Sequence, residues 1–151
     1  PPIMIFSPAR RGRDNTTKHT YENVLQVKQV VINIVNYDIV QQMSLSSTEY
    51  GKGVNEFEKA GLTPLPSQTI KPPRVAESPV QYVLKLEQVI PIELNGTFFV
   101  IGSLQSMYFP EEMMEEDGFL DLAKVGILTS LGTSGYYKTE KINTLPYAKT
   151  T

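Results

Sequence analysis

Two alternating apolar segments joined by a tight-turn signal constrain the fold of this chain most strongly. Residues 80–86 place apolar side chains at every second position, and residues 97–108 form a second long, largely apolar run. Period-two alternation is typical of a half-buried β-strand. Asn95-Gly96 lies between the two runs and is a common hairpin dipeptide. The sequence therefore predicts a long antiparallel β-hairpin.

The other predicted elements are short. The sequence predicts strands at residues 3–6 and 30–35, and helices at residues 20–29, 38–44 and 54–60. Thr20 is the expected N-cap of the first helix, and Gly61 ends the last. The tail from residue 118 to 151 is expected to hold a short helical stretch and a Gly/Ser/Thr-rich loop. Several strands with only short helices favour a mainly β antiparallel barrel over a doubly wound sheet.

The amino-acid composition excludes several classes of function. The 151 residues fit one domain, and a net charge of −2 argues against a general nucleic-acid binder. The absence of cysteine excludes disulfides and thiolate chemistry, and with His19 as the single histidine we expect no metal site. We therefore expect catalysis, if present, to rely on a bound cofactor, and we identify no catalytic residue from the sequence.

No apolar run approaches the roughly 20 residues that cross a bilayer. The N-terminus lacks a signal-peptide layout and begins directly on a predicted strand without an initiator Met. We therefore expect a cytoplasmic protein without membrane partners, from which upstream residues are missing.

Residues 7–20 form a basic, hydroxyl-rich segment with three arginines, one lysine and four hydroxyls, and they lead directly into a predicted helix. A phosphate group binds to such a combination of positive charge, hydroxyl donors and a helix N-terminus. Composition alone leaves a solvated basic loop as an equal alternative. A nucleic-acid-binding arm is a weaker one, because aromatic residues are not interleaved.

The chain resembles the flavin-reductase-like, FMN-binding split-barrel family, which includes flavoredoxin-like flavoproteins. The matching segments occur in the family's order and cover most of the chain: residues 1–8, 18–23, 31–35, 47–57, 60–63, 71–80, 135–137 and 145–149. The middle segments are long enough to be specific. Where the family has Asp between the Lys and the Thr of its phosphate loop, this chain has His19.

The resemblance implies a six-stranded antiparallel Greek-key split β-barrel over residues 1–151, lacking its first strand, with short flanking helices. It also implies a homodimer with FMN near the subunit interface. The family's phosphate-binding loop maps onto the basic segment, and the implied cofactor-binding residues are Ser7, Arg10, Arg13, Asn15, Thr16, Thr17, Lys18 and Thr20.

The leading functional hypothesis is an NAD(P)H-dependent flavin reductase that binds FMN. The alternatives are a non-catalytic FMN-binding or electron-transfer protein and, less favoured, a nucleic-acid-binding barrel. The physiological acceptor and the preference for NADH or NADPH stay open.

Three other features have simpler expectations. The acidic run at residues 111–117 fits no calcium loop and is expected to be a solvated surface loop. Tyr136 and Tyr137 are expected in the C-terminal loop, where one could stack on a flavin. Asn33 interrupts an apolar strand, and we expect its amide to bind a backbone group.

Overall fold

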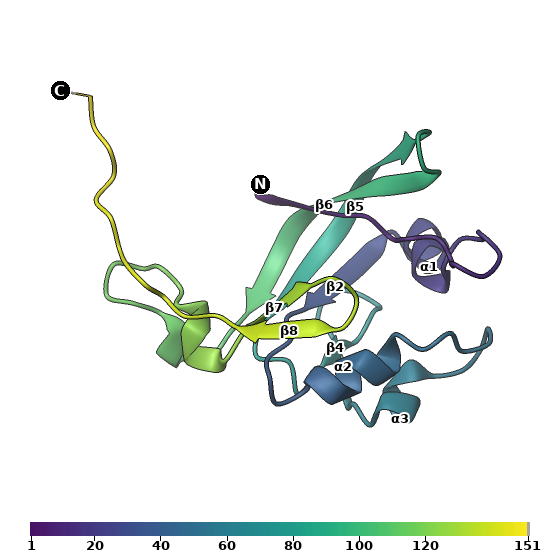
Figure 1. Ribbon diagram of the computed structural model, residues 1–151, viewed down its shortest axis with the longest axis horizontal. Helices are drawn as coiled ribbons and strands as arrows, with labels where there is room; N and C mark the ends of the chain where they lie inside the picture. Colours follow the sequence, from purple (N-terminus) through teal and green to yellow (C-terminus); the bar gives the residue numbers. More distant parts are fainter. Residues whose placement is uncertain (151) are drawn as a thin grey trace.

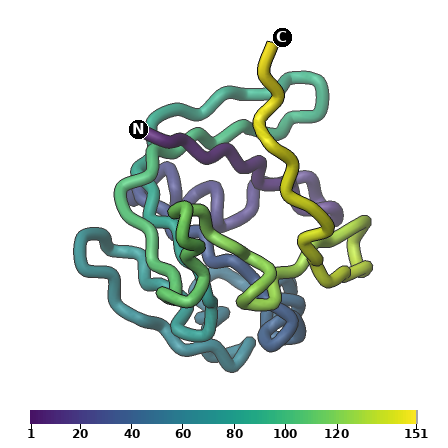
Figure 2. Tube along the Cα trace, turned by 90° about the vertical axis from the view of Figure 1, so that its left-hand side faces the viewer, coloured from purple at the N-terminus to yellow at the C-terminus, as the bar shows by residue number. Residues whose placement is uncertain are grey.

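The computed structural model describes residues 1–150, and its centre is a four-stranded antiparallel sheet. The strand order is β1-β6-β5-β2 (Figure 1), where β1 is Ile3–Phe6, β2 is Gln29–Asn33, β5 is Gln81–Ile92 and β6 is Thr97–Tyr108. All three strand pairings are antiparallel. The N-terminal strand β1 therefore lies beside the hairpin, as the chain trace in Figure 2 also shows.

The long hairpin is confirmed. Strands β5 and β6 pair from Ile92 and Thr97 at the turn to Gln81 and Tyr108 at the far end. At the turn Gly96 has φ +69°, and its N–H donates to the carbonyl of Ile92 at 2.9 Å. A positive φ is favourable for glycine because no Cβ opposes it.

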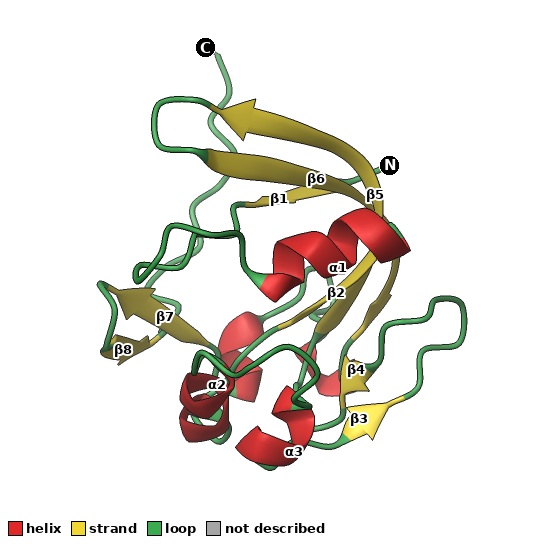
Figure 3. Cartoon of the chain, turned by 90° about the vertical axis from the view of Figure 1, so that its right-hand side faces the viewer, coloured by secondary structure: helices red, strands yellow, loops and turns green. Residues whose placement is uncertain are grey.

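Helix α1 (His19–Val27) packs on one face of the central sheet (Figure 3). Tyr21 stacks on Phe98 of β6 with ring centroids 4.1 Å apart. Val24 is the buried residue of the helix, and Leu84 and Val100 of the sheet are fully buried. This amphipathic packing positions the N-terminus of α1 near the site described below.

The remaining elements are short, and they are α2 (Val40–Ser46), α3 (Glu56–Ala60), β3 (Pro64–Leu65), β4 (Arg74–Val75), the 3-10 turns η1 (Glu111–Met113) and η2 (Leu122–Val125), β7 (Leu128–Leu131) and β8 (Gly135–Lys138). Strands β3 and β4 pair with each other, as do β7 and β8. The mainly β architecture with short helices is as predicted. Its strands are divided among one four-stranded and two two-stranded sheets.

Two local predictions are wrong. The N-cap of α1 is Lys18, and Thr20 lies inside the first turn, so the helix begins without a side-chain cap. Tyr136 and Tyr137 lie in strand β8 and not in a loop, because residues 128–131 provide a pairing partner that the tail's composition concealed. Residues 139–150 follow β8 without regular secondary structure and extend from the body of the molecule (Figure 1).

Within residues 1–150 no helix combines the length and the apolar character that crossing a membrane requires.

Candidate functional site

Two adjoining pockets lie beside α1. The larger one, the apolar pocket, has a volume of about 550 Å³. The smaller one, the polar pocket, has a volume of about 160 Å³. Thr20, Ser46 and Glu56 line both pockets, so the two form one continuous site.

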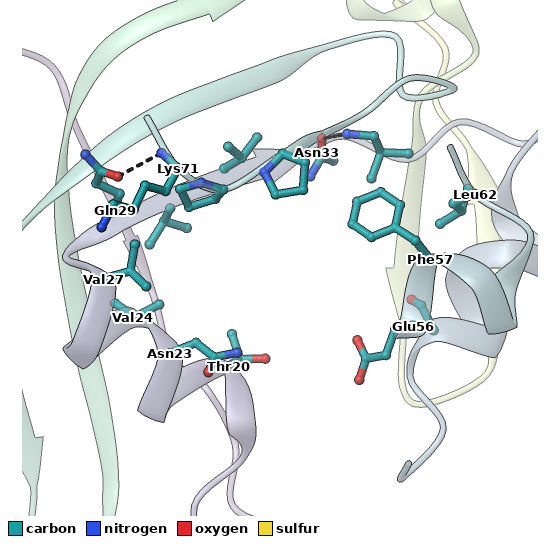
Figure 4. Close-up of a pocket in the computed structure, with 16 residues that line it drawn as sticks. Thr20, Asn23, Val24, Val27, Gln29, Asn33, Glu56, Phe57, Leu62 and Lys71 are labelled. Carbon is teal, nitrogen blue, oxygen red and sulfur yellow. Dashed lines mark hydrogen bonds between the residues drawn. The ribbon is translucent and has the colours of Figure 1, made fainter. Parts of the chain in front are cut away.

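The apolar pocket is lined by β2, α1, α3 and the segment 71–75. Gln29, Val30, Val31 and Asn33 of β2 line it, together with Val24 and Val27 of α1. Further lining residues are contributed by α3 and by the segments on either side of β3 and β4: Phe57, Leu62, Pro72, Pro73 and Val75. Figure 4 shows Phe57 and Leu62 at the opposite end of the pocket from Gln29 and Lys71. A pocket of this volume and lining can accept a planar ring system.

Cationic side chains and hydroxyls line the polar pocket. Arg11 and Lys18 provide the positive charge, and Ser47 and Thr48 follow the C-terminus of α2. Within residues 1–150 no carboxylate forms an ion pair with Arg11 or Lys18. Neither charge is therefore neutralised by an ion pair, although the carboxylate of Glu49 also lines this pocket.

The N-terminus of α1 adds backbone donors to the polar pocket. The N–H groups of Tyr21 and Glu22 donate to the carbonyl of Lys18. In the described chain, the N–H groups of His19 and Thr20 have no protein acceptor. Unpaired N–H groups and the helix dipole favour an anion at this end.

The predicted phosphate-binding residues are not all brought together. Lys18 and Thr20 line the polar pocket. Arg13 lines an outer pocket of about 270 Å³, which shares Arg11, His19, Glu49 and Tyr50 with the polar pocket. The other predicted residues line none of these three pockets: Ser7, Arg10, Asn15, Thr16 and Thr17.

Arg10 instead ties the basic segment to the long hairpin. Its Nε donates to the carbonyl of Gly96 at 2.5 Å, and a terminal nitrogen donates to the carbonyl of Asn15 at 2.7 Å. Its guanidinium also lies 5.9 Å from the ring centroid of Phe98. Arg10 therefore anchors the loop that leads to Lys18.

Asp14 organises the tip of the same segment. Its Oδ1 accepts the hydroxyl of Thr16 at 2.7 Å and the N–H of Thr16 at 3.1 Å. The hydroxyl and backbone bonds from Thr16, with smaller contributions from the charges of Arg13 and Arg11, hold the pKa of Asp14 below its ordinary value. The next residue, Asn15, has φ +57°, a conformation that Asn tolerates better than most residues.

We expect the substitution Thr16→Val to raise the pKa of Asp14 toward its ordinary value, because the hydroxyl donor is lost while the side-chain shape is kept. Because the pKa of Asp14 is lowered in the folded chain, its ionised carboxylate stabilises the turn at pH values above the ordinary pKa. This stabilisation is lost as the pH falls through the folded-state pKa. Titration of the Asp14 carboxyl by NMR measures the change. An unchanged pKa in the variant would contradict the assignment to Thr16.

Several lining residues were missed by sequence reasoning. Arg11 belongs to the basic segment but was not selected, although its guanidinium bonds to the hydroxyl of Thr16 at 2.9 Å and to the carbonyl of Thr17. Ser46, Ser47 and Thr48 lie far from that segment in sequence, and only Ser47 and Thr48 fall in a segment that matches the family, residues 47–57. Glu56 reaches the site from the first turn of α3.

Other expectations concerned individual polar residues. Oδ1 of Asn33 accepts the N–H of Val75 at 2.9 Å, which confirms its expected role. In the acidic run, Glu115 pairs with Lys124 at 3.0 Å. Among the described residues no group of three His, Asp or Glu side chains could hold a metal ion.

Comparison with known proteins places the chain in a family. Residues 1–138 match the family model of the flavin reductase like domain. An uncharacterized protein of Aquifex aeolicus is 33% identical over 138 residues, which cover 91% of this chain and 69% of the relative.

Solved structures agree. A split-barrel-domain protein of Shewanella frigidimarina, described as a flavin reductase, is 36% identical with a TM-score of 0.89, over 98% of this chain and 72% of that protein. The 2-nitrobenzoate 2-nitroreductase NbaA of Pseudomonas fluorescens is 26% identical with a TM-score of 0.78, over 97% and 71%. The chain therefore belongs to the flavin-reductase-like family of split-barrel, flavin-related oxidoreductases.

Proposed function

We propose that this protein binds FMN and is an NAD(P)H-dependent flavin reductase. One observation carries the proposal: a cationic, hydroxyl-lined pocket and an apolar pocket form one site through three shared polar residues, Thr20, Ser46 and Glu56. The site thus has a cationic part, a polar junction and an apolar part. FMN has matching parts in the same order: a phosphate, a polyol chain and a flat ring. When bound, the flavin would supply hydride and electron transfer, and the protein would bind and orient it.

The polar pocket supports binding of the phosphate. Arg11 and Lys18 offer charge, the α1 N-terminus offers N–H donors, and Thr48 offers a hydroxyl. Arginine can bind two phosphate oxygens at once, and charge-assisted bonds are the stronger ones. Arg13 in the outer pocket is a further candidate, whereas Arg10 would act by holding the loop. Direct contacts from Ser7, Asn15, Thr16 and Thr17 stay predictions.

The junction and the apolar pocket suit the rest of the molecule. The hydroxyls of Thr20 and Ser46 and the carboxylate of Glu56 can bond to the hydroxyls of a polyol chain. Beyond them, Val31, Phe57 and the prolines of segment 71–75 provide apolar surface for a ring.

A visible spectrum of the protein reconstituted with FMN tests the proposal. We expect bound-flavin absorbance, and bleaching by NADH or NADPH without oxygen. A bound flavin that neither nucleotide reduces would leave only the alternative of a non-catalytic FMN carrier. Failure to bind FMN at all would overturn the flavin site.

We also propose a homodimer. The strand register places Ile5 opposite Ile101 and Ile90 opposite Phe99, so these side chains share one face of the sheet. Ile3, Ile5, Ile90 and Phe99 on that face are exposed by 59%, 54%, 39% and 44%. An exposed apolar patch of this kind marks an interaction surface. Light scattering should give twice the monomer mass, and a monomer at micromolar concentration would contradict the proposed dimer.

A cytoplasmic location stays a prediction.

A further inference from the structure

Three side-chain amides line the apolar pocket, those of Asn23, Gln29 and Asn33, and the neighbouring backbone fixes the orientation of the last two. Oε1 of Gln29 accepts the N–H of Lys71 at 3.0 Å, and Oδ1 of Asn33 accepts the N–H of Val75 at 2.9 Å (Figure 4, dashed lines). A carboxamide has one oxygen acceptor and one NH₂ donor. Because each oxygen already accepts a backbone N–H of segment 71–75, the NH₂ groups are the uncommitted ends of these two amides.

Neither NH₂ group is used inside the protein. In residues 1–150 neither donates to a protein acceptor, and neither is among the buried polar atoms without a partner. Both groups therefore keep some exposed surface, and both residues line the pocket. Exposed donors without protein partners at a pocket favour a ligand that carries acceptors.

The pocket has a polar end and an apolar end. Gln29 and Lys71 lie at one end, where an amide donor and an ammonium group occur together. Phe57 and Leu62 lie at the opposite end and offer only carbon. Within the described chain, no carboxylate forms an ion pair with Lys71.

A flavin ring has the same asymmetry. Its pyrimidinedione end carries two carbonyl acceptors, and its dimethylbenzene end carries none. We infer, resting on the FMN binding proposed above, that this pocket orients the ring with the pyrimidinedione end toward Gln29 and Lys71 and the dimethylbenzene end toward Phe57 and Leu62. Asn33 contributes a further donor along the ring.

The orientation has a redox consequence. Reduction of a flavin places additional negative charge at the pyrimidinedione end, and a nearby cation favours that charge. Lys71 therefore raises the midpoint potential of the bound flavin. Gln29 and Lys71 together determine the ring's orientation and bias it toward the reduced form.

The substitution Gln29→Glu tests the inference with little change of shape. Glutamate keeps an oxygen that can accept the N–H of Lys71 but replaces the NH₂ donor with a second, negatively charged oxygen. We expect FMN to bind about tenfold more weakly or worse, and the midpoint potential to fall. Gln26→Glu is the matched control, because Gln26 is exposed on α1 and lines none of the three pockets.

Lys71→Met is the second variant, and it leaves the Lys71 backbone bond to Gln29 in place. We expect a lower midpoint potential with a smaller loss of FMN affinity, while Lys59→Met on α3 leaves both unchanged. Unaltered affinity and potential in both Gln29→Glu and Lys71→Met, with FMN bound by the wild type, would overturn the ring orientation and leave the proposed function intact. Failure of the wild type to bind FMN would remove both.

Discussion

Replacement of Lys18 by methionine should weaken FMN binding by about tenfold to a hundredfold, because a hydrogen bond to a charged group contributes about 1.5–3 kcal/mol. Lys18 is exposed at the N-cap of α1, lines the polar pocket and forms no ion pair within the described chain. Methionine keeps an unbranched side chain and removes only the charge and its donors. Titration of FMN fluorescence against the protein measures the dissociation constant.

Riboflavin provides the internal control for the Lys18 variant. It has the same ring and polyol chain but no phosphate, so its affinity should be equal in the wild type and the variant. An equal loss for both ligands would mean that the substitution distorts the site, and an unchanged FMN affinity would contradict phosphate binding at the polar pocket. Lys59→Met should change neither ligand, because Lys59 lines none of the three pockets.

Leu84→Ala should lower the free energy of unfolding by about 2–5 kcal/mol, the usual cost of emptying a packed core site. Leu84 has no exposed surface, and a Cβ added at Gly102 would lie 3.0 Å from the Cβ of Leu84. Backbone and side chain are therefore in close contact here, and the strands cannot easily close over a cavity. Urea unfolding of the two proteins measures the difference.

Leu94→Ala is the matched control for the core, since Leu94 in the hairpin turn is 96% exposed. We expect a change within about 0.5 kcal/mol for this surface substitution. Leu84 lines none of the three pockets, so the folded Leu84→Ala protein should retain its FMN affinity. Equal stabilities of the two variants would contradict the assigned core.

Local chemistry was sufficient to predict the long hairpin. Alternating apolar residues and an Asn-Gly turn act over neighbouring positions, so β6 forms where the pattern placed it, while β5 continues beyond the predicted residues 80–86 to Ile92. The same reasoning failed for Thr20, because a hydroxyl residue at the right spacing is a possible cap only if the chain turns there. The chain turns two residues earlier, at Lys18.

The candidate site was predicted only in part. The basic segment was found because its charged residues are close together in the sequence. Their order in the sequence does not reveal which part of the fold each side chain reaches. Arg10 and Arg11 are neighbours in sequence, yet Arg10 bonds to the hairpin turn at Gly96 while Arg11 lines the polar pocket. Ser46 and Glu56 enter the site only because the folded chain brings α2 and α3 to the pockets that α1 also lines, and no local pattern encodes that proximity.

The sequence by itself determined the long hairpin, the short helices and the family, because periodicity, turn dipeptides and matching segments are properties of neighbouring residues. The tertiary structure decided which polar groups remain available. Arg74 follows a proline-rich connection in the sequence, but the fold buries it with its guanidinium 3.8 Å from the ring centroid of Tyr108. Lys18 and Lys71, by contrast, remain exposed beside the pockets. Burial and hydrogen bonding depend on contacts between distant segments, and those contacts decide which charges stabilise the fold and which can bind a ligand.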